Sequence, residues 1–441
     1  MRNCVAKGFA LVLACVLLAG LAACGSNDGG SGGSSGGGGS TTAEKRLSGT
    51  ITVWDLNYRS FPDYTRAVDK LDAAFEALHP GVTIRHVGVP LAQEAQTLQA
   101  AFTARRGPDV INLHPGPTGV LHWSKGLERL NDRVTDDMRE NLVGWEMLST
   151  DLEGGGDLYA VPSGLFGFVF YYNKQLFRRA GLPTDFKPQT WEELKEAAEK
   201  LKAAGIQPFA GGNKEGYENG WWLDAGWQTV NTPEQASQLG RGEIPFTDPI
   251  VEKAYEPQRM MQEAGLFAED SFTTPLFPDG VQRFADGKGA MILGGFAIAA
   301  SYAQFNPTLG ERNVGLFFSP GSRYLTAFPS SPWGIPSFST NKDAAWAYIE
   351  YTISKEGQEL LYKEGKVLPA HKGVEIAADA PVQERMLLEA ARSQPTGPSA
   401  HQMISGSAQE ALRNDINEAH QGRKSFEDAL QAVQDANEKS K

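Results

Sequence analysis

The chain has 441 residues, of which 41% are hydrophobic and 21% are charged, and its formal net charge is −12. This length predicts two or three domains with sizeable cores, and the composition excludes a disordered or fibrous protein. The negative charge argues against nucleic-acid binding, which relies on clustered cations. Cys4, Cys15 and Cys24 are the three cysteines, so the rest of the chain has no intramolecular disulfide framework.

The N-terminus predicts a lipoprotein signal peptide. Arg2 and Lys7 form a short basic segment before an uncharged apolar run over residues 8–23, which is short for a membrane-spanning helix and suits a signal-peptide core. The run ends in Leu21-Ala22-Ala23-Cys24, which is typical of a bacterial lipobox. We therefore expect residues 1–23 to be removed and Cys24 to carry two acyl chains, enough for a stable membrane anchor. The alternative is an ordinary cleavage site followed by a chance cysteine.

Residues 24–48 are expected to form a tether after the lipidated cysteine. The stretch 25–40 contains nine glycines in sixteen residues and no apolar side chain that could be buried. Such a composition is typical of a flexible linker. The folded part of the chain is therefore expected to begin near Ser48.

A first α/β unit follows the tether. The sequence predicts strands over 50–54, 82–87 and 107–113, separated by helices over 61–79 and 91–105. This alternation indicates a parallel sheet with right-handed crossovers. Sheets of this kind bind ligands beyond the carboxyl ends of their strands. Here those ends are residues 55–59 and 112–116.

A second α/β unit occupies much of the remaining chain. Residues 166–172 and 289–293 are expected to be buried strands, and Thr190 with Glu193 indicates a capping box that starts a helix ending near 204. A long amphipathic helix is expected over 344–364, and the chain after 382 is mostly helical, with a last helix over 426–437. The stretch 211–226, rich in glycine and asparagine, is interpreted as a loop.

Several short motifs together resemble the carbohydrate-type extracellular solute-binding proteins of ABC importers. They are Ala160-Val161-Pro162 followed by Tyr171-Tyr172-Asn173-Lys174, the helix start at 190–194, the segment 284–295 (FADGKGAMILGG), Gly107-Pro108-Asp109-Val110, and the helix start at 422–430 (GRKSFEDAL). Each motif is weak alone, but they occur in the family's order and span residues 49–430. In Gly107-Pro108-Asp109-Val110 the glycine adjoins the proline, whereas the family has one residue between them.

The resemblance implies a two-lobed clamshell of the periplasmic-binding-protein type II class. Each lobe would be a mainly parallel sheet flanked by helices, and hinge crossings would join the lobes. We expect lobe one to comprise 49–161 and 316–368, and lobe two 165–313 and 370–441. The hinge would include Pro162-Ser163-Gly164, the stretch around Gly315, and Pro369-Ala370. Closure of the lobes on a ligand is a standard hinge motion. The alternative for these glycines is ordinary turn chemistry.

Aromatic side chains are expected to line the cleft of such a protein, because sugar rings present apolar faces that flat side chains cover. Tryptophans in expected loops and phenylalanines near strand ends are the candidates: Phe166, Trp221, Trp222, Phe296 and Trp333. For each, the alternative is burial in the core.

Polar ligand candidates are the residues that follow the ends of predicted strands. The residues that leave the first and third strands, or follow an expected hinge strand, are Asp55, Asn57, Tyr58, Arg59, Asn112, His114 and Arg323. Their side chains would pair with sugar hydroxyls. The alternative for Arg323 is simple exposure to solvent.

The sequence favours a binding protein over an enzyme. The seven histidines show no metal-binding spacing, no phosphate-binding loop or dinucleotide fingerprint is present, and no cofactor is expected. A secreted glycosidase with two carboxylates across a cleft stays as a minor alternative. A polyamine or peptide cargo is the other. The resemblance implies a monomer that is anchored to the membrane, does not bind nucleic acid, and delivers its ligand to the transmembrane subunits of an ABC permease.

Overall fold

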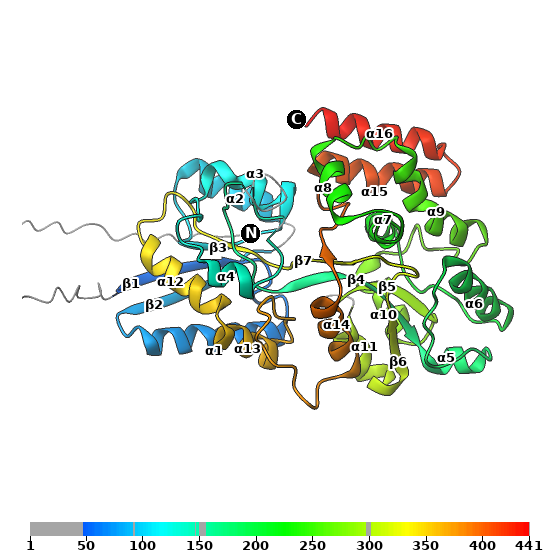
Figure 1. Cartoon of the computed structure of the whole chain (residues 1–441), viewed down its shortest axis with the longest axis horizontal. Helices are drawn as coiled ribbons and strands as arrows, with labels where there is room; N and C mark the ends of the chain where they lie inside the picture. The colour runs from blue at the N-terminus through cyan, green and yellow to red at the C-terminus, as the bar shows by residue number, and fades with distance from the viewer. Residues whose placement is uncertain (1–46, 91–92, 146, 150–155, 297–300, 441) are drawn as a thin grey trace, which may run out of the picture. The chain divides into compact units, whose positions relative to one another are not determined.

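Two β-sheets organise the part of the chain that the structure describes (Figure 1). This computed structural model describes residues 47–90, 93–145, 147–149, 156–296 and 301–440. The expected signal peptide, Cys24 and most of the tether lie outside these residues. Within the described ranges, every helix falls short of the length and hydropathy that a membrane span requires.

The first sheet has the strand order β2-β1-β3-β8. Strand β1 (Gly49–Asp55) pairs in parallel with β2 (Val82–Gly88) and with β3 (Val110–Asn112), and the two-residue strand β8 (Trp333–Gly334) pairs with β3 in the antiparallel direction. The prediction of a parallel sheet is confirmed here. The carboxyl ends of β1 and β3 therefore lie at the same edge of the sheet.

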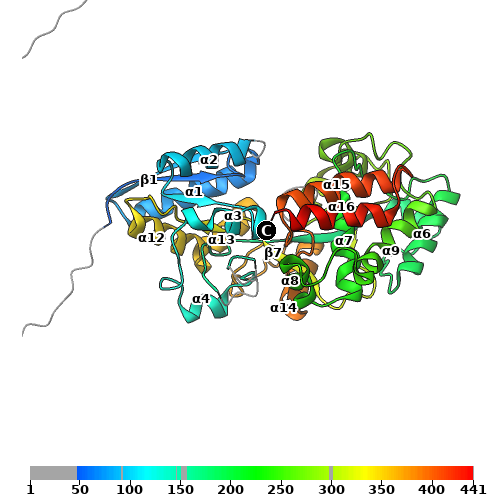
Figure 2. The same cartoon turned by 90° about the horizontal axis from the view of Figure 1, so that it is seen from above.

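Helix α1 (Pro62–Leu78) shows why this unit folds as predicted. Val68, Leu71 and Phe75 are spaced three or four residues apart and are all buried, so they form one apolar face. These three side chains belong to one apolar core with residues of β1 and β2. Figures 1 and 2 show the ribbon of α1 beside that of α13 (Lys355–Gly365). The other helices of this unit are α2 (Glu94–Ala104), α3 (Val120–Trp123), α4 (Asp136–Asn141), α12 (Lys342–Ile353) and α13 (Lys355–Gly365).

The single helix expected over 344–364 is two helices in the structure. Helix α12 ends at Ile353 and α13 begins at Lys355. Ser354 separates them in an extended conformation, and its hydroxyl accepts a hydrogen bond from the Gly357 backbone. An N-cap serine satisfies an otherwise unpaired amide, so it stabilises a new helix start at this point.

The second sheet differs from the expected mainly parallel one. Its central strand β4 (Leu165–Asn173) is antiparallel to β5 (Met291–Gly295), to β6 (Val314–Phe317) and to β7 (Leu325–Pro329). Within the described residues, the short pairing of β7 with β9 (Thr396–Gly397) is the only parallel pairing between the strands of this sheet. The chain enters β4 from the first sheet, and the three strands beside β4 run in the opposite direction. The α/β class with two sheets is nevertheless confirmed.

The chain crosses between the two sheets three times. Val161 bridges Trp333 in the first sheet, and Leu165 begins β4 in the second. The chain returns from the second sheet to the first after Pro329, because β6 and β7 both pair with β4. Residues 316–329 therefore belong with the second sheet, and the expected crossing at Gly315 is wrong. Gly315 lies within β6, opposite Tyr172, whose ring leaves no room for a Cβ atom.

Hydrogen bonds tie the three crossings together. The Ser330 amide donates to the carbonyl of Gly164 (2.8 Å), which joins the first crossing to the second. The buried side chain of Gln358 donates to the carbonyl of Ser163 and accepts from the amide of Ala370 (3.0 Å). Gln358 of α13 thus links the first crossing to the third.

Helix α7 (Tyr217–Val230) replaces the loop expected over 211–226. Its two glycines allow close packing: a Cβ atom at Gly226 would lie 1.8 Å from the carbonyl oxygen of Ala254, and one at Gly220 would meet the ring of His401. Trp222 and Trp227, together with neighbouring apolar residues, are fully buried. Their burial outweighs the poor helix propensity of glycine and asparagine.

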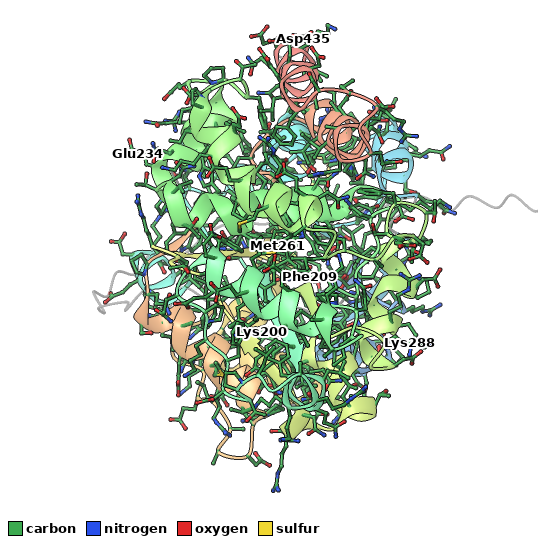
Figure 3. All side chains as sticks on the ribbon, turned by 90° about the vertical axis from the view of Figure 1, so that its right-hand side faces the viewer. Lys200, Phe209, Glu234, Met261, Lys288 and Asp435 are labelled. Atoms are coloured by element: carbon green, nitrogen blue, oxygen red, sulfur yellow. The ribbon has the colours of Figure 1, made fainter. Side chains whose placement is uncertain are left out.

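Ten helices of the described chain surround the second sheet. Figure 3 shows the side that carries α6 and α9, where Phe209 and Met261 lie in the interior and Lys200 and Glu234 lie at the surface. Besides α7 they are α5 (Lys174–Arg179), α6 (Trp191–Ala203), α8 (Pro233–Arg241), α9 (Pro249–Glu263), α10 (Val281–Ala285), α11 (Tyr302–Leu309), α14 (Val382–Ser393), α15 (Gly406–His420) and α16 (Phe426–Glu438).

Candidate binding site

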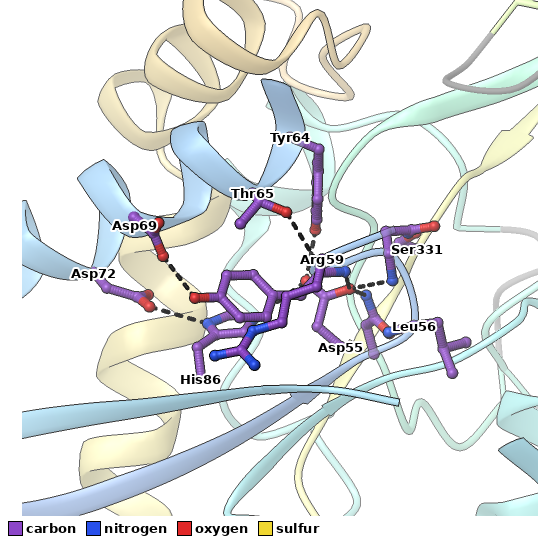
Figure 4. A network of polar contacts seen from close by, with 12 residues as sticks. Asp55, Leu56, Arg59, Tyr64, Thr65, Asp69, Asp72, His86 and Ser331 are labelled. Atoms are coloured by element: carbon purple, nitrogen blue, oxygen red, sulfur yellow. Dashed lines mark hydrogen bonds and ion pairs between the residues drawn. The ribbon is translucent and has the colours of Figure 1, made fainter. Parts of the chain in front are cut away.

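Asp55 is the centre of a polar network at the end of β1 (Figure 4). Its side chain is fully buried. Oδ1 accepts hydrogen bonds from the Asn57 amide (2.7 Å) and from Nδ2 of Asn112 (2.7 Å), and Oδ2 accepts one from the Tyr64 hydroxyl (2.8 Å). These partners use most of the carboxylate's acceptor capacity. Because the Asn112 side chain also accepts from the Leu56 amide (2.9 Å), Asp55 and Asn112 tie the loop that follows β1 to the end of β3.

His86 of β2 joins this network. Its Nε2 lies 3.2 Å from Oδ2 of Asp55 and its Nδ1 lies 3.0 Å from Oδ2 of Asp72, which also accepts a hydrogen bond from Tyr348 (2.6 Å) through its other oxygen. Burial alone would lower the pKa of His86, but its contacts with Asp55 and Asp72 raise that pKa to about 9. The ring is therefore an imidazolium at neutral pH.

The loop after Asp55 carries three of the predicted ligand residues. Asn57 donates from Nδ2 to the Ser331 hydroxyl (2.8 Å), and the Tyr58 hydroxyl donates to Asp69 (2.7 Å). Arg59 has a positive φ of 68° and lies over the Tyr58 ring. The structure brings these residues together at the sheet edge. Asn57 and Tyr58 are partly exposed and Arg59 is exposed, so all three are accessible to a solute.

His114 follows Asn112 at the same edge of the sheet. Its Nε2 lies 3.2 Å from a carboxylate oxygen of Glu94, and 42% of its side chain is exposed. Two residues further on, a Cβ atom at Gly116 would lie 2.9 Å from the carbonyl oxygen of Gln402. The loop after β3 therefore lies against a residue of the second unit.

Gln402 belongs to a pocket of about 100 Å³ on the second unit. Trp221 and Tyr217 stand one helical turn apart on α7, and Arg413 of α15 lies over the Tyr217 ring at 5.4 Å. Phe277 stands beside Trp221, with ring centroids 6.1 Å apart. The pocket is lined by Tyr217, Gly220, Trp221, His401, Gln402, Gln409, Leu412 and Arg413.

Tyr217 and Phe277 are unusual because they are large, apolar and exposed. Their exposed fractions are 40% and 41%, and among the described residues only Leu78 is a comparable exposed side chain. Both flank Trp221. Sequence reasoning missed both residues. Had α7 been predicted, the spacing of Tyr217 and Trp221 would have placed them on one face, whereas nothing in the sequence marks Phe277.

His401 was also missed, and a buried carboxylate fixes its ring. Nδ1 lies 2.8 Å from Oδ2 of Asp224, and the Ser399 hydroxyl donates to the same oxygen (2.6 Å). Nε2 lies 3.2 Å from the Gln402 side-chain amide on the pocket side. These are the residue types of a hydrolase triad, but Ser399 contacts Asp224 and the Nδ1 side of His401, whereas a nucleophile would face Nε2. The arrangement orients a histidine toward the pocket.

Glu218, next to Tyr217 on α7, is a buried acid. Its exposed fraction is 6%. Its Oε1 lies so close to Gly211 that a Cβ atom added there would be 1.9 Å from it. Burial raises the pKa of Glu218 to about 8. The side chain is therefore largely protonated at neutral pH.

The remaining predicted aromatic residues lie deeper than expected. Trp221 is 8% exposed and borders the pocket, but Trp222 is 1% exposed and contacts Phe170 and Phe209. Trp333 is in strand β8, where a loop was expected, and is 2% exposed. The burial of Trp222 and Trp333 leaves little surface for a solute.

Phe166, Phe296 and Arg323 lie elsewhere on the second unit. Phe166 and Phe296 stack with their ring centroids 6.5 Å apart, and Phe296 lines a separate cavity of about 230 Å³. Arg323 is exposed and donates to the carbonyl of Val230 at the end of α7 (3.1 Å). In the described ranges, no cluster of three or more histidine, cysteine or acidic side chains could hold a metal ion.

Comparisons with known proteins agree with this architecture. The chain is 28% identical over 199 residues to an uncharacterized ABC transporter extracellular-binding protein of Pyrococcus horikoshii. The aligned residues cover 43% of this chain and 44% of that protein. It is 23% identical over 362 residues to the multiple sugar-binding protein of Streptococcus mutans, covering 77% of this chain and 80% of that protein.

A solved structure has the same fold. The structure of a chitin oligosaccharide binding protein matches with a TM-score of 0.75 and 23% identity, covering 89% of this chain and 98% of that chain. The bacterial extracellular solute-binding protein family matches residues 60–359, which is more than half of the chain. This chain therefore belongs to the bacterial extracellular solute-binding protein family.

Proposed function

We propose that this chain is the substrate-binding lipoprotein of an ABC importer and that its ligand is a mono- or oligosaccharide. It would capture the sugar outside the cytoplasm and deliver it to the transmembrane subunits of a permease. The family membership supports a solute-binding role. The observation that carries the choice of a sugar is the pair of exposed aromatic side chains near Trp221: Tyr217, which lines the same pocket, and Phe277, whose ring contacts that of Trp221.

Aromatic surfaces of this kind suit a sugar ring. The C–H faces of a pyranose are apolar and stack on flat side chains, while its hydroxyls need hydrogen-bond partners. His401, Gln402 and Arg413 supply such partners beside Tyr217 and Trp221. In the relatives named above, sugar binding is stated for the Streptococcus mutans protein and for the chitin oligosaccharide binding protein.

The first sheet would supply the opposite wall of the site. Asn57, Tyr58, Arg59 and His114 are at least partly exposed at the carboxyl ends of β1 and β3, where such sheets bind ligands. Asp55 and Asn112 would position the loop after β1 rather than contact the sugar. We retain Trp221, Phe166 and Phe296 as ligand candidates, whereas the burial of Trp222 and Trp333 and the helix-capping contact of Arg323 favour structural roles for these three.

The anchor completes the proposal. A lipidated Cys24 would tether a monomer to the outer side of the cell membrane through residues 25–48, which places the binding site near the permease. The chain would need no cofactor. Binding rather than catalysis is supported by the placement of Ser399 on the Nδ1 side of His401. A polyamine, a peptide or a glycosidase substrate are the alternatives that the experiment must separate.

The test is a thermal-shift screen of the purified full chain against mono- and oligosaccharides, polyamines and peptides. A cognate sugar at about 100 times its Kd should stabilise the fold by about 2.7 kcal/mol. Any hit is then titrated calorimetrically and incubated for new reducing ends. A hit among polyamines or peptides only, or turnover of a bound oligosaccharide, would overturn the proposal. Tyr217→Ala should weaken sugar binding, while Tyr351→Ala, a partly exposed tyrosine of α12, should not.

A further inference from the structure

A cavity of about 320 Å³ lies away from the candidate sugar site. This volume is at the lower end of the range typical of small-molecule pockets. None of the residues placed in the sugar site lines it. Its lining consists of Val143, Leu165, Pro369, Ala370, His371, Lys372, Leu388, Ala391 and Arg392.

The walls of this cavity are fixed by backbone hydrogen bonds. The Leu165 amide, at the start of β4, donates to the carbonyl of Leu368 (2.8 Å), and the Val143 amide donates to the carbonyl of Ala370 (3.1 Å). Helix α14 supplies the remaining wall through Leu388 and Ala391. The cavity is therefore formed by the folded chain itself, at the third crossing between the sheets.

The lining of the cavity consists of apolar and basic residues. Six of its residues are apolar, and the other three are His371, Lys372 and Arg392. Among the residues that the structure describes, no acidic side chain lines the cavity, although the chain as a whole carries a formal charge of −12. Asp137 acts electrostatically on His371 without being part of the lining.

Among the described residues, Lys372 and Arg392 donate hydrogen bonds only to backbone carbonyls. Lys372 donates from Nζ to the carbonyl of Glu140 (2.6 Å), and Arg392 donates from Nη2 to the carbonyl of Val374. Within the described part of the chain, neither forms a salt bridge. Partial burial lowers the pKa of His371, so at neutral pH the positive charge of the lining comes from Lys372 and Arg392.

We propose that this cavity binds a medium-chain carboxylate. The hydrocarbon chain would lie against Val143, Leu165 and Leu388, and the carboxylate would face the basic rim formed by Lys372 and Arg392. An apolar wall removes the hydrocarbon from water, and a guanidinium matches a carboxylate in charge and in hydrogen-bond geometry. Neither a sugar nor a small inorganic anion offers both features.

Octanoate is the probe for calorimetric titration of the purified full chain at neutral pH. We expect saturable binding with one site per chain. Octanamide has the same tail without the charge, and acetate has the charge without the tail, so both should bind at least about tenfold more weakly. Equal binding of octanamide or of acetate would overturn the proposal, as would the absence of saturable octanoate binding in the millimolar range.

Variants locate the binding. Arg392→Gln should weaken octanoate binding roughly tenfold. Arg385→Gln is the matched control, because Arg385 lies on the same helix, also donates to a backbone carbonyl and does not line the cavity. Ala391→Phe fills the cavity and should abolish binding. Melting temperatures without octanoate identify a misfolded variant, and Lys372→Gln then replaces it. Unchanged affinity in the folded Arg392→Gln and Ala391→Phe variants would overturn the assignment.

Discussion

The imidazole of His86 and the carboxylate of Asp55 join two neighbouring strands at their carboxyl ends, with Nε2 of the ring 3.2 Å from Oδ2 of the carboxylate. The backbone of the loop after Asp55 is bonded to the same carboxylate through the Asn57 amide. The ring also contacts Asp72 of α1. One buried cation thus fixes the loop that would present Asn57 and Tyr58 to a ligand.

This relationship predicts a specific pH dependence of stability. The pKa of His86 is about 9 in the folded protein and near 6.5 in the unfolded chain. A raised histidine pKa contributes stability that is fully present below about pH 6.5 and is lost as the pH rises through about 9. The contribution is about 3 kcal/mol, which His86→Gln should remove from the free energy of unfolding at about pH 6.

Urea unfolding at about pH 6 and about pH 9.5 measures this difference. The free energy lost by His86→Gln should be large at the lower pH and much smaller at the higher one. His122→Gln serves as the control, because His122 is an exposed histidine of the same unit. An equal loss at both pH values would show that His86 stabilises the fold by packing alone.

Glu218 predicts a substitution that stabilises the protein. Its pKa is about 8 in the fold and near 4.5 in the unfolded chain. For an acid whose folded pKa is raised, stability is present below the unfolded pKa and is lost as the pH rises through the folded one. Glu218→Gln removes this penalty and should raise the free energy of unfolding at pH 7 by about 3 kcal/mol. The gain should vanish at about pH 4.

Chemical denaturation at these two pH values tests the effect, with Glu234→Gln as control. Glu234 also lies in the first turn of a helix, but its side chain is exposed. A destabilised Glu218→Gln variant at pH 7 would mean that the carboxylate is ionised and paired in the folded protein.

The first sheet could be predicted from the sequence because its signals are local. Strands β1 and β2 and helix α1 follow regular apolar spacing, and their connections allow few arrangements. The direction of β4 relative to β5, β6 and β7 could not be predicted. Those pairings join residues far apart in the chain, and each strand is buried on both faces, so its pattern carries no information on direction.

Part of the candidate site could be predicted from the sequence, and part could not. The position of Asn57, Tyr58 and His114 at one edge of the sheet could be predicted, because a parallel sheet places strand ends together. Tyr217 and His401 were missed for a tertiary reason. Gly220 lets the ring of His401 approach α7, and the pocket is lined by these and other residues from distant segments. The low helix propensity of glycine favours a loop at Gly220, so the sequence does not indicate the pocket.

The anchor has its own test. Cys24→Ser should abolish incorporation of labelled fatty acid and release the protein from the membrane fraction, because only Cys24 follows the lipobox residues. Cys15→Ser is the matched control, since Cys15 lies inside the apolar run and should leave labelling intact. Full membrane retention of the unlabelled Cys24→Ser protein would show that another feature of the chain attaches it.

Trp222 and Tyr217 test where the binding surface ends and the core begins. Both lie on α7, but Trp222 is 1% exposed and Tyr217 is 40% exposed. Trp222→Ala should lower the free energy of unfolding by about 3–5 kcal/mol, because it opens a cavity among Phe170, Trp191 and Phe209. Tyr217→Ala removes a surface ring and should leave the melting temperature without ligand nearly unchanged.

Sugar binding should respond in the opposite order. Loss of one stacking face at Tyr217 should cost about 1–2 kcal/mol, or roughly 5- to 30-fold in Kd. Trp222→Ala, measured well below its melting temperature, should keep the Kd within about threefold, because its ring faces the core. Titration of both variants with the cognate sugar, beside thermal melts without it, separates the two effects. A Tyr217→Ala variant with unchanged Kd would move the sugar away from α7, and the loops that hold Asn57 and His114 would then be the place to look for it.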